Sequence, residues 1–396
     1  MSDPASDIPG TFSLTWGGPI FRVVQRFGLM REGGRTLAIR AALGFLITYA
    51  PLVVLAAVQG VLVGDRVTLP LAEDLTAYAR FAIAIPLLIF AERSIDRRLA
   101  MAVAHFRTSD MIEGRVRSEF EAAVRGVERT RDALIPELVL LAASFAFAWV
   151  NRRAGPGLPV SNWREVAPGA AGSLTLAGRW LQLVSLPIFS FFIMRWLWRI
   201  LLWWRFLWRV SRLDLKLIAT HPDRAAGLGF LGYVHMAFGA FLVPVAASVA
   251  ARGVQWVQWG GGTLTSLRNA LIAFGVIALA IVLAPLLAFV PKLLATKREG
   301  LLDYSKLGTD YTRGFDQKWV RDARSTDEPL LGTADLQSLA DLANSFQVIQ
   351  GMRVVPILRE NLIALVAAIA LPMLPFLFVV LPLEQMLKQV ASLVMK

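Results

Sequence analysis

Hydrophobic residues run in seven long stretches that carry almost no charge, and polar segments rich in basic residues separate them. About 20 apolar residues in a helix, at 1.5 Å rise per residue, are enough to cross a hydrocarbon core about 30 Å thick. The second stretch contains Arg80, and the fourth is short. The pattern predicts an all-α, polytopic integral membrane protein with about seven transmembrane helices: Ala41–Val63, Leu75–Ala91, Ala133–Val150, Trp180–Met194, Leu228–Ala251, Ala270–Val290 and Asn361–Leu383.

The segments between these stretches differ in positive charge. If the N-terminus is cytoplasmic, 31 of the 41 Lys and Arg residues lie on the cytoplasmic side and 10 lie outside. Basic residues concentrate on the cytoplasmic side of membrane proteins. We therefore expect a cytoplasmic N-terminus and an external C-terminus. The first residues include Asp3 and Asp7 and do not resemble a secretory signal.

The same pattern predicts the domain organisation. The expected parts are a cytoplasmic N-terminal segment with an amphipathic helix (1–40), transmembrane helices 1 and 2 (41–91), a cytoplasmic helical hairpin (92–132), transmembrane helices 3 to 6 (133–290), a cytoplasmic helical region (291–360), and transmembrane helix 7 with a short tail (361–396).

Every predicted span contains proline, which removes a backbone hydrogen bond and disturbs a helix. Several spans are therefore expected to be kinked. Irregular helices are typical of bundles that line a cavity, as in transport proteins. The prolines are Pro51, Pro86, Pro136, Pro187, Pro244, Pro285, Pro372 and Pro375.

Composition narrows the possible functions. A hydrophobic content of 56% and a mean hydropathy of +0.56 exclude a soluble protein. Without cysteine, the chain has no disulfides, thiolate nucleophiles or cysteine metal sites, and we expect no cofactor. The net charge of +12 is spread over the inner loops, which favours anionic lipid headgroups over nucleic acid as the partner. Arginine outnumbers lysine 34 to 7, a usage that favours a bacterial inner membrane.

Residues 194–212, rich in arginine and tryptophan, form the most unusual segment. Their spacing places the arginines within one arc of a helix. This helix could lie along the cytoplasmic headgroups, where both residue types are common. Alternatively, it could continue straight and line a pore or vestibule that concentrates anions. The candidate pore-lining residues are Arg195, Arg199, Arg205 and Arg209.

The next segment, Thr220–Arg224, is followed by Gly227–Gly232, which formally matches a GxGxxG motif. No strand precedes it, so we reject dinucleotide binding. We expect Pro222 to take the first position of a helix, and the glycines to allow close helix contact. Charge near this segment and within the spans nevertheless suggests a gate or ion site. The candidates are His221, Asp223, Arg224, Glu137 and His235.

Two further helices are predicted in the inner segment 291–360. Aromatic and leucine residues recur every three or four positions from Leu301 to Trp319, and a second helix should run from a cap at Thr333 to Gly351. These helices could cover their own core, or they could contact other subunits or a cytoplasmic protein partner.

The chain shows no recognisable catalytic motif, so we do not expect an enzyme. Proline in every span and the arginine-rich helix favour transport of an ion or small solute. The leading interpretation is a homo-oligomeric, anion-permeable channel. A coupled secondary transporter and a non-transporting membrane scaffold or sensor remain alternatives.

Overall fold

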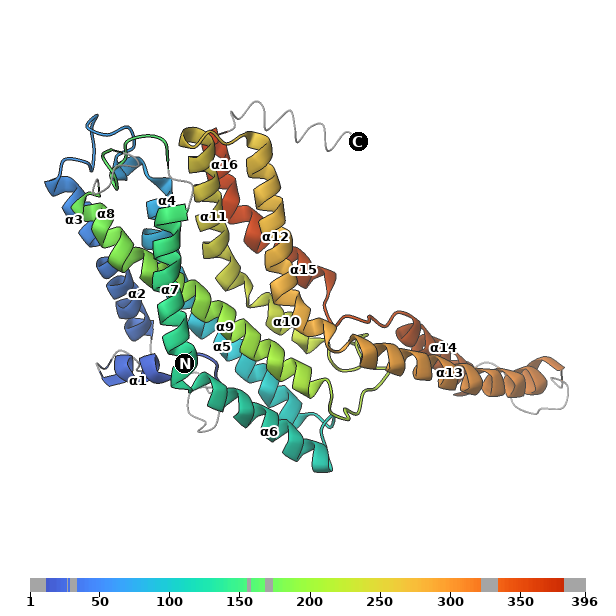
Figure 1. The fold of residues 1–396 in the computed structure, drawn as a ribbon. Helices are drawn as coiled ribbons and strands as arrows, with labels where there is room; N and C mark the ends of the chain where they lie inside the picture. Colours follow the sequence, from blue (N-terminus) through green and yellow to red (C-terminus); the bar gives the residue numbers. More distant parts are fainter. Residues whose placement is uncertain are drawn as a thin grey trace.

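The computed structural model describes residues 12–26, 28, 34–154, 158–167, 174–321 and 334–380, and the described residues are helical, with no strand (Figure 1). The α-helices are α1 (Pro19–Arg26), α2 (Gly34–Thr48), α3 (Ala50–Val58), α4 (Leu75–Ala77), α5 (Ile85–Thr108), α6 (Gly114–Arg131), α7 (Leu134–Ala154), α8 (Leu176–Trp180), α9 (Leu186–Val210), α10 (Phe230–Met236), α11 (Gly239–Trp259), α12 (Leu264–Leu287), α13 (Val290–Phe315), α14 (Ala334–Gln350), α15 (Arg359–Ala370) and α16 (Leu374–Val380).

Seven helical stretches in the described part of the chain are long and apolar enough to cross a membrane, so the predicted all-α fold with seven spans is confirmed at that level. The two stretches that looked weakest in the sequence, the second and the fourth, have 34 and 35 residues and are the longest. The observed stretches are Gly34–Val58, Leu75–Thr108, Leu134–Arg152, Leu176–Val210, Phe230–Trp259, Leu264–Leu287 and Arg359–Phe376.

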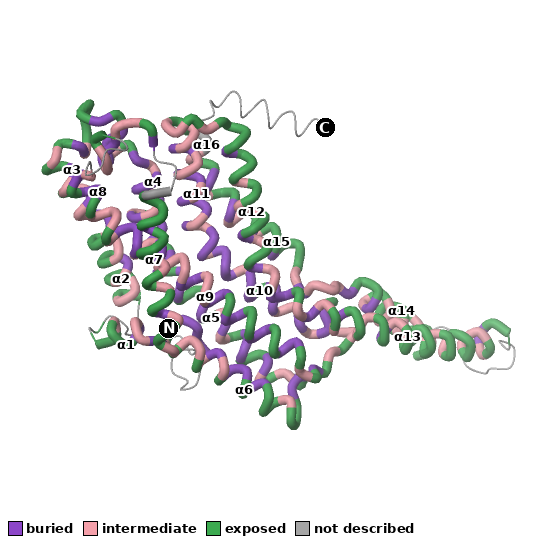
Figure 2. The backbone as a smooth tube through the Cα atoms, in the orientation of Figure 1, coloured by how far each residue is buried: buried purple, intermediate pink, exposed green. Residues whose placement is uncertain are grey.

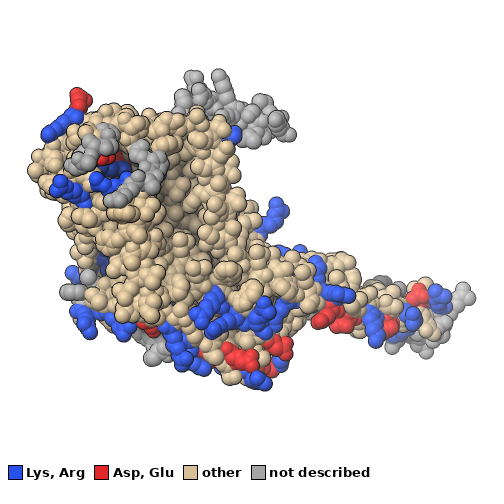
Figure 3. Space-filling model, in the orientation of Figure 1, with Lys and Arg blue, Asp and Glu red and all other residues tan. Residues whose placement is uncertain are grey.

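The bundle has two ends, which we call the α6 end and the α3 end. The α6 end holds α1, α6 and the loop 211–229, whereas the α3 end holds α8 and the loops 59–74 and 158–167 (Figure 1). On the face drawn in Figure 3, charged side chains gather at the α6 end, a smaller group lies near the α3 end, and the body between them is almost uncharged. An uncharged belt with exposed apolar side chains suits a surface that faces lipid.

Several prolines coincide with interruptions of the spans. Pro51 lies in the first turn of α3, directly after the break from α2. Pro86 and Pro187 lie in the first turns of α5 and α9, directly after the π-helical turns η2 (Tyr78–Ala84) and η3 (Leu181–Ser185). π-Helical turns occur often at functional sites. That these prolines kink the spans remains a prediction.

Two groups of buried apolar residues hold the bundle together (Figure 2). The larger group joins α5, α6, α9, α10 and α11 and includes Phe12 from the N-terminal segment. The smaller group joins α2, α3 and η2 to Trp163 in an inter-helix loop. In contrast, α7 and α12 present mostly exposed surface, as expected for helices that contact lipid.

The predicted hairpin 92–132 is helical in both halves, but its first half is not a separate helix. Residues up to Thr108 continue α5 from the second span. Gly114 has a φ of +53°, which favours glycine, and begins α6. Charged positions such as Glu92 and Asp96 consequently lie on a helix that also crosses the bundle.

The second predicted pair of helices forms an arm that projects from the α6 end (Figure 1). The helix α13, extended by the π-helical turn η4 (Asp316–Arg321), packs against α14. Tyr311 Oη donates to the carbonyl oxygen of Asp335 (3.0 Å), and Trp319 Nε1 donates to its carboxylate (3.0 Å). Tyr311 and Trp319 therefore contact α14 of their own hairpin. The predicted cap Thr333 and the C-terminal tail lie outside the described residues.

Candidate functional site

A buried ion cluster lies between α2, α5 and α9. Glu92 of α5 accepts a hydrogen bond from Arg199 Nη1 (2.9 Å) and another from Arg40 Nη2 (2.5 Å). The side chain of Arg199 is 4% exposed and that of Glu92 is 6% exposed, so both charges are almost completely removed from solvent. Such a group is stable only when it is paired and hydrogen-bonded. Glu92 pairs with Arg199 and Arg40 at once and so stabilises both of these charges.

A second ion pair extends this cluster to α7. Arg195, one turn before Arg199 on α9, lies 3.6 Å from Glu137 through its Nη2 and the Oε1 of the glutamate. Both side chains are buried. The other carboxylate oxygen of Glu137 accepts from the backbone N–H of Ile20 (2.7 Å). Two of the predicted residues, Arg195 and Glu137, are therefore direct partners.

Asp96, one turn after Glu92 on α5, has a different environment. Its carboxylate accepts from Ser13 Oγ (2.6 Å) and from the backbone N–H groups of Leu14 (2.7 Å) and Thr15 (3.2 Å). All these donors are neutral, and among the described residues no ion pair involves Asp96. The charge of Arg199 nevertheless acts on it from α9. Asp96 is the buried carboxylate of the cluster with no cation in hydrogen-bond contact.

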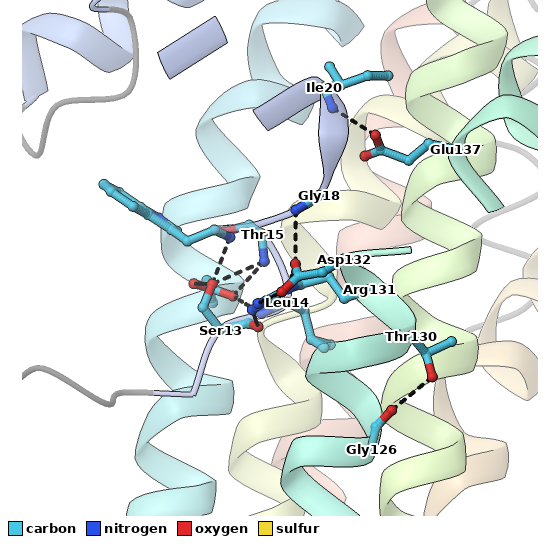
Figure 4. A network of polar contacts seen from close by, with 12 residues as sticks. Ser13, Leu14, Thr15, Gly18, Ile20, Gly126, Thr130, Arg131, Asp132 and Glu137 are labelled. Carbon is cyan, nitrogen blue, oxygen red and sulfur yellow. Dashed lines mark hydrogen bonds and ion pairs between the residues drawn. The ribbon is translucent and has the colours of Figure 1, made fainter. Parts of the chain in front are cut away.

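The segment 12–20 lies across the α6 end and joins these carboxylates (Figure 4). Beyond its contacts with Asp96 and Glu137, the N–H of Gly18 donates to Asp132 (2.9 Å), and Arg131 Nη1 donates to the carbonyl oxygen of Ser13 (2.5 Å). Phe12 is buried next to Trp203 and Phe206, with ring centroids 6.2 and 5.6 Å apart. The segment is thus an integral part of the α6 end.

The arginine-rich helix is one continuous element, because α9 runs unbroken from Leu186 to Val210. Its arginines fall into two groups. Arg195 and Arg199 point into the bundle against carboxylates, whereas Arg205 and Arg209 are exposed. Arg205 Nη1 donates to Thr130 Oγ1 of α6 (2.9 Å). The predicted arc of guanidinium groups therefore divides into buried, neutralised charges and exposed ones.

The predicted site at 221–224 is a tight loop, and the expectation that Pro222 begins a helix is wrong. The next helix, α10, begins at Phe230. Asp223 accepts from the N–H groups of Ala225 (2.8 Å), Gly227 (3.2 Å) and Gly229 (2.8 Å), and these bonds favour the compact turn instead. Arg224 has a φ of +53°. Burial raises the pKa of Asp223, but the three N–H donors and His221 together hold it below its usual value.

This loop is tied to the segment between α14 and α15. Arg353 donates through its N–H to the carbonyl oxygen of Arg224 (2.7 Å) and through Nη2 to that of Asp223 (2.6 Å). His221 Nδ1 lies 2.8 Å from the Asp223 carboxylate. The three predicted residues of this motif are therefore together, but in a loop separate from the ion cluster between α2, α5, α7 and α9.

His235 lies in the apolar core, not in a polar site. Its side chain is fully buried beside Trp203 and Phe238, and Nδ1 contacts the carbonyl oxygen of Leu231 (2.8 Å). Nε2 has no hydrogen-bond partner among the described residues. Among the same residues, no group of three or more His, Asp or Glu side chains is arranged to hold a metal ion.

Sequence reasoning missed the central residues of the cluster, Glu92, Asp96 and Arg40. A signal was available, since Glu92 and Asp96 are spaced by four and lie directly after a predicted span. On a continuous helix this spacing places them on one face.

Comparison with known proteins identifies no relative. No protein-family model, no curated protein and no solved structure matches this chain.

Proposed function

We propose that this protein transports a small anion across a membrane and couples that movement to protons through the cluster of Glu92, Asp96, Arg195 and Arg199. Seven apolar helices are compatible with a membrane transport protein. Burying several ionised side chains inside a bundle is expensive, which makes such residues candidates for a functional role. The buried, unpaired carboxylate of Asp96 is the observation that carries the proposal.

Coupling requires a group that gains and loses a proton within the protein. Glu92 contacts two guanidinium groups, which stabilise its negative charge. Asp96 contacts only neutral donors, so its protonation breaks no direct ion pair. The charge of Arg199 on α9 acts on Asp96, Glu92 lies one turn before it on α5, and Arg131 contacts the carbonyl oxygen of the same Ser13. Protonation of Asp96 would also weaken its bonds to the segment 12–15, which links titration to movement of that segment.

Proton movement can be measured in liposomes that contain the full chain and trapped pyranine, with valinomycin to clamp the voltage. Inward gradients of potassium chloride, nitrate and phosphate serve as probes. We expect at least one gradient to move protons faster than in protein-free liposomes. Asp96→Asn should reduce this rate at least tenfold, because the amide cannot carry the proton.

Asp132→Asn is the matched control. It weakens the hydrogen bond that Asp132 accepts from Gly18 of the same N-terminal segment but leaves the Asp96 carboxylate in place. We expect it to retain most of the proton movement. Equal rates in the wild type and Asp96→Asn, or no proton movement with any of the three anions, would contradict coupled transport.

A second candidate is the anion-permeable channel of a homo-oligomer, favoured by the exposed guanidinium groups of Arg205 and Arg209. In that case Arg205→Gln and Arg209→Gln should lower the chloride-to-potassium permeability ratio, and Asp96→Asn should not. Under both proposals the α6 end faces the cytoplasm of a bacterium, where its basic residues contact anionic headgroups.

A further inference from the structure

The arm formed by α13, η4 and α14 has only a thin core of its own. The residues buried within its described part are Leu293, Gly300, Trp319 and Ile349. In contrast, Leu302 and Val320 are 65% and 66% exposed, and the arm stands clear of the bundle over most of its length (Figure 1). Small units without disulfides often complete their apolar burial by oligomerisation. The exposed apolar surface therefore favours a partner for the arm.

A groove of about 640 Å³ lies between the two helices of the arm. Its lining combines apolar and small polar side chains with one basic and one acidic residue. Such a groove can take the side chains of a helix that packs beside it. The lining includes Thr309, Thr312, Arg313 and Asp316 from α13 and η4, and Leu339 and Phe346 from α14.

Charges on the outer side of α13 alternate in sign. Lys306, Asp310, Arg313 and Asp316 follow one another at spacings of four, three and three residues, so they lie along one side of the helix. Asp316 pairs with the exposed Arg321 of η4 (2.6 Å). The other three are exposed and take part in no ion pair among the described residues. Their charges are therefore available to a partner.

This order of signs matches its own reverse. If two copies of α13 lie antiparallel, with a two-fold axis beside residues 311 and 312, Lys306 of one copy lies opposite Asp316 of the other. In the same register Asp310 lies opposite Arg313, and Leu302 lies opposite Val320. A parallel pairing in register would place like charges together. Charges at the edges of paired helices determine partner and orientation, and an isologous dimer requires a self-complementary surface.

The direction of the arm permits this pairing within one membrane. The arm extends sideways from the α6 end, away from the spans (Figure 1). A two-fold axis along the membrane normal therefore brings two arms together antiparallel. Both α6 ends then lie on the same side of the membrane, and the two bundles lie at opposite ends of the paired arms.

We propose that the arm is a dimerisation surface, on which a second copy of this chain packs antiparallel along α13 and its groove. The contact combines apolar residues at the two ends of the paired segment with opposite charges between them. It does not depend on proton-coupled transport, because the ion cluster lies in α2, α5, α7 and α9.

Single thiols can test the pairing, because the chain contains no cysteine. Thr312→Cys and Ser305→Cys both place a thiol at an exposed position of the groove lining. In the antiparallel dimer, Cys at position 312 lies beside its own copy, whereas position 305 lies about 20 Å from its copy along the helix axis. A short bismaleimide is added to the full chain in liposomes at low protein density.

We expect Thr312→Cys to form cross-linked dimer at least tenfold faster than Ser305→Cys. Equal rates at the two positions would overturn the antiparallel pairing, since a parallel pair brings both positions beside their copies. No cross-link at position 312 would overturn the dimer.

A charge exchange in the Thr312→Cys chain provides a second test. Arg313→Asp places like charges opposite each other at positions 310 and 313, so the cross-linking rate should fall at least fivefold. Adding Asp310→Arg restores opposite charges and should restore most of the rate. Arg115→Asp, on the exposed surface of α6, should leave the rate unchanged. Failure of Asp310→Arg to restore the rate would contradict the proposed register.

Discussion

At the scale of single residues, the buried arginines are stabilised in two different ways. Arg195 and Arg199 at the α6 end each meet a carboxylate. Arg80 at the α3 end lies against the ring of Phe189 and is attracted by the carboxylate of Asp74. A buried charge that loses its partner is strongly destabilising, whereas removal of both partners is often tolerated. The two ends should therefore respond differently to substitution.

Glu92→Gln tests the cluster at the α6 end. The substitution leaves Arg40 and Arg199 buried beside a neutral amide, and we expect it to reduce the free energy of unfolding by about 3 kcal/mol. Adding Arg199→Met should restore a large part of this loss, because it removes one uncompensated charge. Unfolding in detergent by urea measures both. A double variant less stable than Glu92→Gln would show that the pair is not the dominant contact.

Asp223 predicts a pH dependence in the loop 221–229. Its pKa is lower in the folded protein than the ordinary value of about 4, so its stabilisation of the loop is complete above about pH 4. This stabilisation is lost as the pH falls below that value and the carboxylate is protonated. Amide hydrogen exchange at Ala225, Gly227 and Gly229, corrected for intrinsic rates, should accelerate on going from pH 6 to pH 3.

Asp223→Asn should show accelerated exchange already at pH 6, by about tenfold if the lost bonds contribute about 1.4 kcal/mol. Its exchange should then depend little on pH. Amides of α3, at the opposite end of the bundle, provide the internal control. An unchanged pH dependence in Asp223→Asn would mean that another group controls the loop.

At the scale of elements, the hydrophobic runs predicted the locations of all seven spans. A span requires only a sufficiently long stretch with almost no charge, and such a stretch can be recognised in the local sequence. Arg80 lowered the apparent quality of the second run, yet the helical stretch extends to Thr108, and Arg199 of another helix pairs with its Glu92. Contacts between distant segments, such as Ser13 with Asp96, leave no periodic signal. The locations of the spans were therefore predictable, but the ends of several helices and the pairing of charges were not.

Glycines where helices meet give a prediction for packing. A Cβ at Gly232 of α10 would lie 2.7 Å from the carbonyl oxygen of Pro356 and 2.9 Å from the Cα of Ile357, which are backbone atoms that move little. Gly232→Ala should thus destabilise the protein by about 1–3 kcal/mol. Gly308→Ala on the arm meets nothing within 4 Å and should be neutral or stabilise by about 0.5–1 kcal/mol. The midpoint of thermal unfolding in detergent, measured for both variants and the wild type, tests the two expectations.

The segment 12–20 can be followed directly because the chain contains no cysteine. Ser13→Cys places one thiol at a buried position next to Asp96. Its reaction with maleimide should be slow, and adding Phe12→Ala should accelerate it at least tenfold, because the ring that packs on Phe206 is lost. Ser118→Cys, on the exposed surface of α6, provides the fast reference. Equal rates at positions 13 and 118 would show that the segment is not held.

At the scale of the whole molecule, the candidate residues separate into distinct places. Arg195 and Glu137 meet at the α6 end, His221 and Asp223 share a neighbouring loop, and His235 lies in the apolar core. The sequence could single out these residues because charge within a span is unusual. It could not assign them to sites, since that depends on how α2, α5, α7 and α9 pack. Arg80 stood out for the same reason, but its neighbours Asp74 and Arg164 became evident only in three dimensions.

Orientation in the membrane decides which side the ion cluster at the α6 end and the arm face. Seven crossings place the α6 end and the α3 end on opposite sides, and the excess of basic residues near the α6 end predicts that it faces the cytoplasm. Arg115→Cys at the start of α6 and Asp65→Cys in the loop 59–74 introduce single exposed thiols at the two ends. In intact spheroplasts, a membrane-impermeant maleimide should label position 65 but not position 115. Permeabilisation should then expose position 115, and labelling of both in sealed cells would refute seven crossings. The reverse pattern would place the arm outside the cell and would contradict the proposed contact of the α6 end with inner-leaflet headgroups.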